Sequence, residues 1–379
     1  MTDFDYQPLG RVVFGPGTLD RLGELTAGLG ISRVLLVTDP GLQSVGHPER
    51  AARSLREAGL AVFTFMGVKE NPTEKEVDAG VAVARMHAVN GIVAVGGGSS
   101  MDCAKGVNFI LTNGGRMPDY KGHGKATKPM LPSVGVPTTA GTGSEAQSYA
   151  LITDASSHMK MACGDKKAAF RVSILDPELT VSQPKMLGAV TGIDAVAHAV
   201  ESFVCTKRNS ISETFSRAAW RHLEPNIERV LEVPDDLAAR SAMQLGAHFA
   251  GMAIENAMLG VCHSCANPLT AHYGITHGTA IGLMLPHVIR FNAPAAGHLY
   301  ADLVGECGRS DGEPASEVLA RRIAKMVKAA GLPTTLRECG VSDTILPLLS
   351  EEANQQWTAR FNPRPVTEAD ILQIYRSAW

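Results

Sequence analysis

Short hydrophobic runs alternate with amphipathic stretches in the first half of the chain. The runs at 33–37 (RVLLV) and 91–95 (GIVAV) are rich in β-branched residues and end at turn residues, which predicts buried strands. Between them, 48–59 has helical periodicity and ends at a glycine. We interpret the three segments as a βαβ unit and expect further strands at 134–136 and 173–175. This pattern favours an α/β domain on a mostly parallel sheet.

The pattern changes near residue 180, where β-branched runs give way to amphipathic segments rich in Ala, Leu, Glu and His. Ser182 followed by Pro184 favours the start of a helix. Helices are predicted at 185–203, 210–231, 235–259, 278–292 and 315–330. Pro225 is expected to kink or split the second of them. The second half is therefore predicted to be nearly all helical.

The length of the chain supports two domains, because 379 residues exceed what one ordinary hydrophobic core holds. We expect an α/β domain over residues 1–183 and an all-helical domain over residues 184–379. The boundary near 180–185 has the composition of a hinge rather than that of a flexible linker.

Composition and charge argue against several classes of function. Hydrophobic residues make up 45% of the chain and charged residues 19%, as in well-packed globular proteins. A net charge of −3 makes nucleic acid and anionic membranes poor partners. We expect no secretory signal, because the N-terminus lacks a basic segment followed by an apolar one, and no apolar stretch long enough to cross a bilayer.

The seven cysteines are odd in number and scattered, which is typical of reduced thiols and favours the cytoplasm. Cys262 and Cys265 form a C-x-x-C pair, but no second pair follows at the spacing of a zinc ribbon. We therefore expect buried free thiols rather than a cysteine metal site.

Two glycine-rich loops in the first half suit phosphate binding. The loop at 96–102 (GGGSSMD) follows a predicted strand and opens a helix, whose amides and dipole attract anions. It is not G-x-G-x-x-G, so a tight structural turn is an equal alternative. The loop at 137–145 (PTTAGTGSE) offers hydroxyls and amides, although Thr142 or Ser144 could simply cap a helix. Two such loops in one domain favour a dinucleotide.

Asp39 bears on the choice of dinucleotide, because it stands at the end of the first predicted strand. A carboxylate there accepts hydrogen bonds from an adenosine ribose and repels a 2′-phosphate, so NAD would be preferred over NADP. The alternative, which the residues alone favour, is a turn residue before Pro40.

Four side chains in the second half have the chemistry of a metal site. Asp194 and His198 lie four apart in a helical pattern and so share one helix face. His263 and His277 follow, 14 residues apart. Three imidazoles and a carboxylate suit Fe(II), Zn(II) or a similar ion. An Asp–His pair on a helix is more often a hydrogen-bonded core histidine, so its spacing alone leaves a structural role open.

Eight sequence blocks carry a resemblance to a known family. They are NPT (71–73), GGGSSMDCAK (96–105), PTTAGTGSE (137–145), LDPEL (175–179), GIDAVAHAVES (192–202), NAMLGVCHS (256–264), HGTAIGLMLPHV (277–288) and NPRP (362–365). In content and order they resemble the iron-containing (group III) alcohol dehydrogenase family over essentially the whole chain. The resemblance implies a dehydroquinate synthase-like fold, with a dinucleotide-binding domain, a helical domain, and a cleft between them for metal and nicotinamide.

The resemblance also implies roles for individual residues. The expected metal ligands are Asp194, His198, His263 and His277, with Fe²⁺ the expected ion and Zn²⁺ or another divalent ion as alternatives. The residues expected to bind NAD are Asp39, Asn71, Gly96, Gly97, Gly98, Ser99, Asp102, Thr138, Thr139, Thr142, Ser144, Tyr149, Lys160 and Leu179. The family is usually a dimer or a larger oligomer, so a homo-oligomer is expected.

One departure from the family affects the expected catalytic group. Asn267 stands where the family commonly has a second histidine in an H-x-x-x-H pattern. An amide cannot relay a proton, although it can orient an alcohol or a water. His272 could substitute, but a structural histidine at a helix end is the simpler interpretation. Lys160, with two nearby lysines, suits either an anionic ligand or a solvated surface.

Together these features predict a metal-dependent, NAD-linked oxidoreductase that interconverts a small primary alcohol or diol and its aldehyde, the metal acting as a Lewis acid on the substrate oxygen. Two alternatives remain at this point. One is a dehydroquinate synthase-like lyase that uses NAD and a metal without net oxidation, and the other is a catalytically impaired nucleotide-binding homologue.

Overall fold

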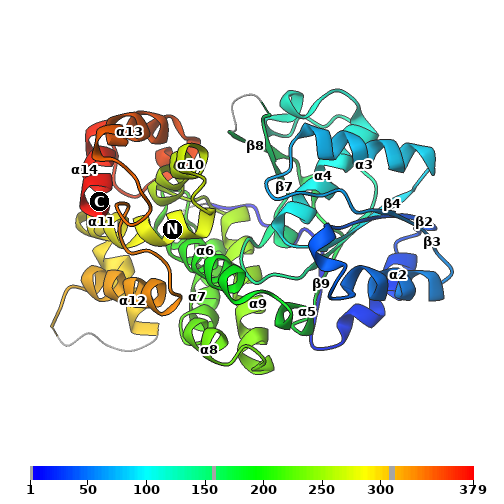
Figure 1. Cartoon of the computed structure of the whole chain (residues 1–379), viewed down its shortest axis with the longest axis horizontal. Helices are drawn as coiled ribbons and strands as arrows, with labels where there is room; N and C mark the ends of the chain where they lie inside the picture. Colours follow the sequence, from blue (N-terminus) through cyan, green and yellow to red (C-terminus); the bar gives the residue numbers. More distant parts are fainter. Residues whose placement is uncertain (1–2, 156–158, 307–311) are drawn as a thin grey trace. The chain divides into compact units, whose positions relative to one another are not determined.

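The structure is a computed structural model of the chain and describes residues 3–155, 159–306 and 312–379. Residue contacts divide it into two compact units, Gln7–Gln183 and Pro184–Trp379, the second of which also includes residues 3–6. The first unit holds all the strands and the second unit is helical (Figure 1). The predicted fold class, an α/β domain and an all-helical domain, is confirmed.

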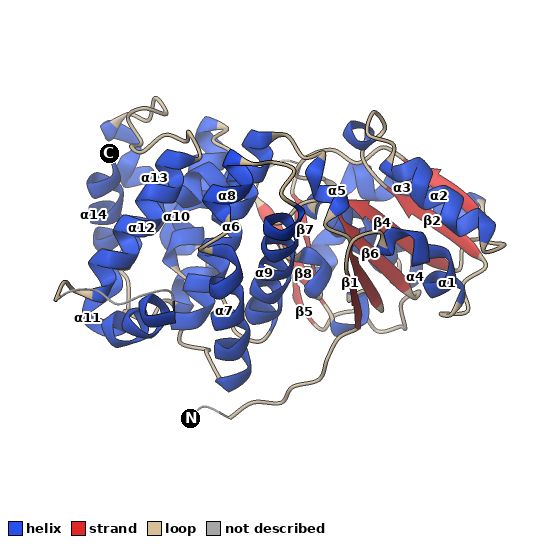
Figure 2. Ribbon diagram, turned by 90° about the horizontal axis from the view of Figure 1, so that it is seen from below, coloured by secondary structure: helices blue, strands red, loops and turns tan. Residues whose placement is uncertain are grey.

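A six-stranded parallel sheet organises the first unit. Its strands are β1 (Arg11–Phe14), β2 (Arg33–Val37), β3 (Ala61–Phe65), β4 (Gly91–Gly96), β6 (Ser133–Pro137) and β9 (Val172–Leu175). Their order is β1-β9-β6-β4-β2-β3. Figure 2 labels β1, β6, β4 and β2 of this sheet. Val34 to Val37 of β2 pair with Gly91 to Ala94 of β4, so the two predicted strands are neighbours.

Helices cover both faces of this sheet. Leu35 and Val37 of β2 belong to a core with residues of α3 (Glu74–Met86) and α4 (Gly98–Asn113). Val34 and Leu36 belong to a second core, with residues of α1 (Leu22–Ala27) and α2 (His47–Glu57). Side chains of a strand alternate between faces, so burial of both faces explains why its sequence is continuously apolar.

The βαβ unit predicted from 33–37, 48–59 and 91–95 is incomplete. Helix α2 leads to β3, and α3 then leads to β4 on the other side of β2. Strand β3 lies at the edge of the sheet and only Phe65 in it is buried, so it lacks a strong hydrophobic signal. A small second sheet was also not predicted. It consists of β5 (Gly122–His123), β8 (Lys160–Gly164) and β7 (Tyr149–Thr153), with β7 and β8 antiparallel.

The helical unit contains α6 (Lys185–Val204), α7 (Ser210–Leu223), α8 (Ile227–Glu232), α9 (Leu237–Glu255), α10 (Val261–Tyr273), α11 (His277–Glu306), α12 (Ala315–Ala329), α13 (Leu346–Gln355) and α14 (Glu368–Ala378). The chain splits between α7 and α8 around Pro225, as predicted. Helix α10 was missed, because Pro268 inside it interrupts the expected pattern. Helix α11 was predicted too short and continues through Pro286 and Pro294.

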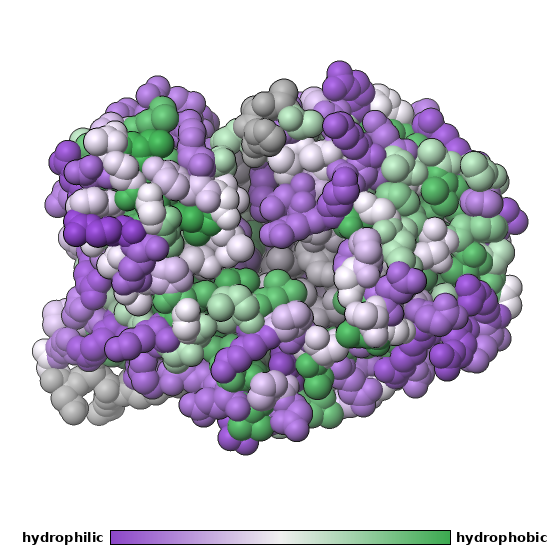
Figure 3. All heavy atoms as spheres, in the orientation of Figure 1, coloured by the Kyte–Doolittle hydropathy of each residue, from purple (hydrophilic) through white to green (hydrophobic). Residues whose placement is uncertain are grey.

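The expectation that no apolar stretch is long enough to cross a bilayer is wrong for helix α6. Its length and composition would suffice to span a membrane, but 83% of its most apolar 18-residue segment is buried within the protein. Such burial is typical of a core helix in a globular protein. On the face shown in Figure 3, hydrophilic residues cover much of the surface, with smaller hydrophobic areas among them.

The expectation of buried free thiols is confirmed for Cys103, Cys163, Cys205, Cys262 and Cys265. Cys339 is free and partly exposed, and Cys307 lies outside the described residues. Burial raises the pKa of the Cys262 thiol well above its usual value. Burial also raises the pKa of the Cys265 thiol, so the C-x-x-C pair consists of two buried thiols that favour the protonated form.

Candidate metal centre and nucleotide-binding loops

Helix α6 presents the first two residues of the candidate metal centre. Asp194 and His198 lie one turn apart and are each 6% exposed. The helix is buried along nearly its whole second half, so both polar side chains point into the interior of the helical unit. Polar groups in such a place need partners, because an unpaired buried charge is costly.

Two other helices bring the remaining histidines to α6. His263 lies in the first turn of α10, and His277 is the first residue of α11. Gly278 explains how α11 comes so close, because a Cβ at this position would lie 2.0 Å from the carbonyl oxygen of Val190. Val190 stands one turn before Asp194 on α6, so this backbone contact places His277 beside the aspartate.

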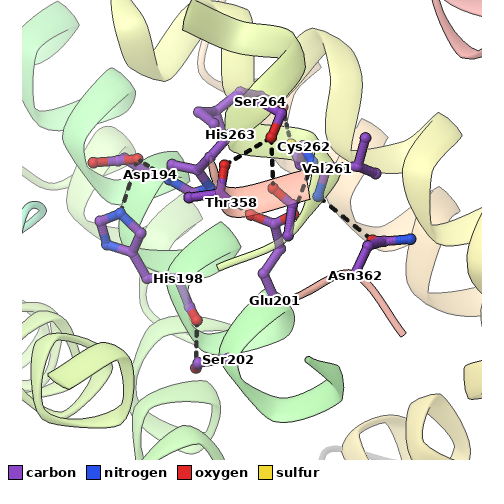
Figure 4. A network of polar contacts seen from close by, with 12 residues as sticks. Asp194, His198, Glu201, Ser202, Val261, Cys262, His263, Ser264, Thr358 and Asn362 are labelled. Carbon is purple, nitrogen blue, oxygen red and sulfur yellow. Dashed lines mark hydrogen bonds and ion pairs between the residues drawn. The ribbon is translucent and has the colours of Figure 1, made fainter. Parts of the chain in front are cut away.

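The three imidazoles converge on one carboxylate oxygen. The Nε2 atoms of His198, His263 and His277 lie 3.3, 3.5 and 3.6 Å from Asp194 Oδ1. Ligand atoms of Asp194, His263 and His277 all lie within 4.8 Å of one another, and His198 joins this group through Asp194. Figure 4 shows Asp194, His198 and His263 pointing toward one another.

The hydrogen bonding of this cluster fits a cation. Asp194 Oδ1 and His263 Nε2 are buried and hydrogen-bond to no residue that the structure describes. Buried polar atoms without partners are rare and require an explanation. Nitrogen and carboxylate oxygen atoms turned toward a common point are the donor set that Fe²⁺ and Zn²⁺ bind. The residues present therefore fit a divalent ion.

The charges within the cluster support this arrangement. Burial would raise the pKa of Asp194, but the neighbouring histidines outweigh burial and lower it, so the carboxylate stays ionised. Burial would lower the pKa of His263, whereas Glu201 and Asp194 raise it to about 9. The cluster thus favours positive charge at this point.

Asn267 and His272 lie further along α10. Asn267 Nδ2 donates to Gln356 Oε1 at 3.2 Å. His272 Nε2 lies 2.8 Å from Glu352 Oε2, and both side chains are about one-third exposed. His272 therefore matches the simpler interpretation, a surface histidine at a helix end. Asn267 stands one turn after His263 and so shares its helix face.

The candidate nucleotide loops meet at one edge of the parallel sheet. Asp39 follows β2, Gly97 and Gly98 follow β4, and Thr138 follows β6. These three strands are adjacent in the order β6-β4-β2. The chain runs from β2 outward to β3 and then back across β2 to β4, so the strand order reverses here. Ligands of open α/β sheets bind at this kind of switch point, beyond the carboxyl ends of the strands.

Close packing between the loops requires their glycines. A Cβ on Gly98 would lie 2.7 Å from the side chain of Thr142, and one on Gly97 would lie 3.3 Å from that of Thr139. Asn71, whose φ is 51°, donates its amide hydrogen to Ser99 Oγ at 3.3 Å. The structure therefore brings these predicted cofactor residues together.

Asp39 faces the first glycine loop and does not cap the turn that follows it. Its backbone is extended, and within the described structure its side chain makes no capping bond to the 3₁₀ turn at Pro40–Leu42. Instead Ser100 Oγ donates to Asp39 Oδ2 at 3.3 Å. A Cβ on Gly96 would lie 3.1 Å from the same oxygen. The carboxylate thus lies beside the glycine loop, and its role at the ribose stays a prediction.

Lys105 of α4 connects the helix that follows the first loop to the second loop. It is 1% exposed, and its Nζ donates to Ser144 O, Ser144 Oγ and Tyr149 O at 2.7 to 2.8 Å. Ser144 Oγ donates in turn to Asp102 Oδ1 at 2.7 Å. Burial raises the pKa of Asp102, against the effect of Lys105. Ser144 is therefore part of a buried network that also includes Lys105, a residue that was not among the predicted site residues.

The other predicted cofactor residues are less closely tied to the loops. Tyr149 lies on β7, where its ring packs over Gly164 of β8. Lys160 starts β8, opposite Thr153, and contributes electrostatically at Asp102. Leu179 lies in α5 (Glu178–Val181) and is 1% exposed in the core on the α1 and α2 face of the sheet. Burial leaves Leu179 little surface for contact with an adenine.

Comparison with known proteins agrees with the geometry. Residues 10–177 match the family described as iron-containing alcohol dehydrogenase, and residues 188–379 match its C-terminal domain family. The NAD-dependent methanol dehydrogenase of Bacillus methanolicus is 35% identical over 100% of both chains. The 1,3-propanediol dehydrogenase of Citrobacter freundii is 36% identical over 99% of both. A crystal structure of a 1,3-propanediol oxidoreductase superposes with a TM-score of 0.96, at 35% identity and 100% coverage of both chains.

A parallel-sheet domain with glycine loops at its switch point, and a helical domain with a carboxylate and three imidazoles, define a metal- and nucleotide-dependent class of enzyme. The chain belongs to the iron-containing alcohol dehydrogenase family.

Proposed function

We propose that this protein is a metal-dependent, NAD-linked dehydrogenase that interconverts a small primary alcohol or diol and its aldehyde. One observation carries the proposal: three imidazole Nε2 atoms lie 3.3 to 3.6 Å from a single buried oxygen of Asp194. Family membership supports the reaction class, and relatives named for methanol, 1,3-propanediol and lactaldehyde support small substrates.

Asp194, His198, His263 and His277 would hold the metal, Fe²⁺ in the first instance. A divalent cation in such a site supplies Lewis acidity at the substrate oxygen. Asp194 contributes one negative charge, while the imidazoles contribute neutral nitrogen ligands. The four ligands alone would leave part of the charge of the cation uncompensated, in a buried environment where electrostatic effects are stronger than in water.

The α/β unit would bind NAD through the residues gathered at its switch point. The Gly96–Ser99 loop and the start of α4 suit the diphosphate, because backbone amides and the helix dipole favour anions there. Thr138, Thr139 and Thr142 add hydroxyl groups. The Asp39 carboxylate suits a ribose with free hydroxyls and disfavours a 2′-phosphate.

Asn267 gives this chain a non-titrating side chain beside His263. Because its amide is already anchored to Gln356, we infer that it orients the alcohol or a water and does not relay protons. The proton released on alcohol oxidation would then leave through water or through substrate and cofactor hydroxyls.

Three further assignments belong to the proposal. Domains at 1–183 and 184–379 would form the nucleotide and metal halves, except that residues 3–6 group with the helical unit. The free thiols suit a cytoplasmic enzyme. Because members of the family are usually dimers or larger oligomers, we expect a homodimer or a larger homo-oligomer.

The test uses the full chain, stripped of metal by a chelator and then reloaded anaerobically with Fe²⁺ or Zn²⁺. Short primary alcohols and diols are supplied with NAD, and the aldehydes with NADH, while NADH absorbance is followed. We expect turnover only in reloaded protein. Full turnover in stripped protein, or metal binding and NAD binding without turnover on the whole panel, would contradict the proposal.

A further inference from the structure

Glu201 is a buried carboxylate beside the candidate metal centre that the expected ligand set does not include. It stands seven residues, about two turns, after Asp194 on α6 and so shares its face. It is 3% exposed. One carboxylate oxygen, Oε2, hydrogen-bonds to His263 Nδ1, and the other, Oε1, accepts the amide hydrogen of Cys262 at 2.8 Å (Figure 4).

The start of α10 explains why a charged group can be buried here. Its N-cap residue, Gly260, has no side chain to satisfy the first amides of the helix. Glu201 accepts from Cys262 N, and Asn362 Oδ1 accepts from Val261 N at 3.4 Å, so residues distant in sequence provide the cap. The positive end of a 13-residue helix also favours an anion. The start of α10 therefore stabilises a negative charge at the position of Glu201.

Asn362 fixes the same helix end from the other side. Its amide makes a reciprocal pair with Asn292 of α11, at 2.7 and 3.0 Å, and donates to Arg364 O at 2.7 Å. The NPRP block at 362–365 thus anchors the first turn of α10 to α11. Hydrogen bonds to Glu201 and to Asn362 therefore hold the backbone directly before His263.

A carboxylate at Nδ1 decides which form of the His263 ring is present. An ionised carboxylate only accepts hydrogen bonds, so Nδ1 must carry the hydrogen. The neutral ring then has its lone pair on Nε2, the atom that lies 3.5 Å from Asp194 Oδ1. Carboxylate partners of this kind orient metal-bound histidines and raise their basicity.

We propose that Glu201 is a positioning residue that fixes the Nδ1–H tautomer of His263 and aims its Nε2 at the metal. This inference rests on the proposed function, since it needs a metal at the four-residue cluster. The alternative is a buried ion pair that only joins α6 to α10.

Glu201→Gln separates the two roles, because it keeps the size of the side chain. The amide oxygen retains the bond from Cys262 N, and the amide NH₂ then faces Nδ1 as a donor. This favours the tautomer with hydrogen on Nε2, which cannot ligate. We expect Zn²⁺ affinity, measured by competition with a chelator on the full chain, to fall about 10–100-fold. Glu201→Asp keeps a carboxylate and should recover part of this loss.

Ser264→Ala is the matched control. Ser264 is also buried in the first turn of α10, and its hydroxyl bonds to Thr358 Oγ1 at 2.7 Å. Its loss removes this hydrogen bond, and a second one to Gly260 O at 3.4 Å, from the same helix without touching Glu201. We expect a modest fall in Tm and a Zn²⁺ affinity within about twofold of the parent, since hydrogen-bond loss affects stability rather than ligand geometry.

A spectroscopic measurement decides the question even if Glu201→Gln fails to fold. In the Zn²⁺-loaded parent labelled with ¹⁵N-histidine, the His263 shifts should show a protonated Nδ1 and a metal-bound Nε2. A parent that binds no Zn²⁺ refutes the proposed metal site itself. A parent that binds Zn²⁺, combined with unchanged affinity in Glu201→Gln or an unprotonated His263 Nδ1, refutes only the role of Glu201.

Discussion

The contact between α11 and α6 can be tested by adding one methyl group at Gly278. A Cβ there would lie 2.0 Å from Val190 O and 2.6 Å from Val190 C. Both atoms belong to backbone, so no side chain can rotate away. Contacts under 3.0 Å are essentially never observed, so Gly278→Ala must separate the two helices by about 1 Å.

Such a displacement is large compared with the tolerance of metal–ligand distances, but its cost in folding stability is moderate. His277 adjoins Gly278 and would move with it, whereas ligand distances tolerate only about 0.2 Å. Overpacking of this kind costs about 1–3 kcal/mol, which lowers the Tm of a domain of this size by roughly 2–12 °C. We therefore expect Gly278→Ala to lose most of its bound metal and to unfold earlier.

The assay compares metal content by elemental analysis, and Tm by circular dichroism in excess chelator. Measuring Tm on stripped protein separates the steric cost from the stabilisation that a bound metal adds.

Gly297→Ala in the same helix is the control, because a Cβ there meets nothing within 4 Å among the described residues. Replacing a glycine inside a helix should stabilise it by about 0.5–1 kcal/mol and leave the metal bound. If Gly278→Ala matched Gly297→Ala in metal content and Tm, the account of this helix contact would be wrong.

Three further substitutions test the site. His263→Ala should release the metal and abolish turnover while circular dichroism shows the helices intact; activity in metal-free mutant protein would contradict this. Asp39→Gly should shift the ratio of kcat/KM for NAD over NADP toward NADP by about tenfold, or about 1.4 kcal/mol, because the repulsion of the 2′-phosphate is lost; equal use of both cofactors by the parent would refute the role of Asp39. Asn267→His adds a group whose ordinary pKa is about 6.5 and should add an inflection in that range to the pH profile of kcat/KM; an unchanged profile would show that this position has no influence on proton transfer.

The elements that could be predicted from the sequence are those whose hydrophobic pattern follows from burial of one or both faces. Strands β2 and β4 are covered on both sides, so their apolar runs are unambiguous. Strand β3 is covered much less and was missed. Helix α10 was missed because Pro268 lies within it, although it carries His263. The local sequence pattern therefore fails to predict a helix that tertiary contacts stabilise despite an internal proline. It also fails to predict a strand that lies at the edge of the sheet.

The site shows the same limit. The chemistry of the residues, together with the sequence blocks that resemble the family, was enough to select the four candidate ligands. Glu201 lies 61 residues before Cys262, and nothing local shows that its carboxylate caps a distant helix. Lys105 lies inside a matched block, but its bonds to Ser144 and Tyr149 depend on how two loops fold together. Groups that act through another residue become visible only in three dimensions.

The proposed function requires that one divalent cation binds to Asp194, His198, His263 and His277. Crystals of metal-loaded protein, measured with anomalous diffraction at the absorption edge of that metal, test it most directly. We expect a single peak about 2.0–2.2 Å from one Asp194 oxygen and from the Nε2 atom of each histidine. A fully loaded crystal with its peak elsewhere, or with these side chains bonded only to one another, would contradict the account.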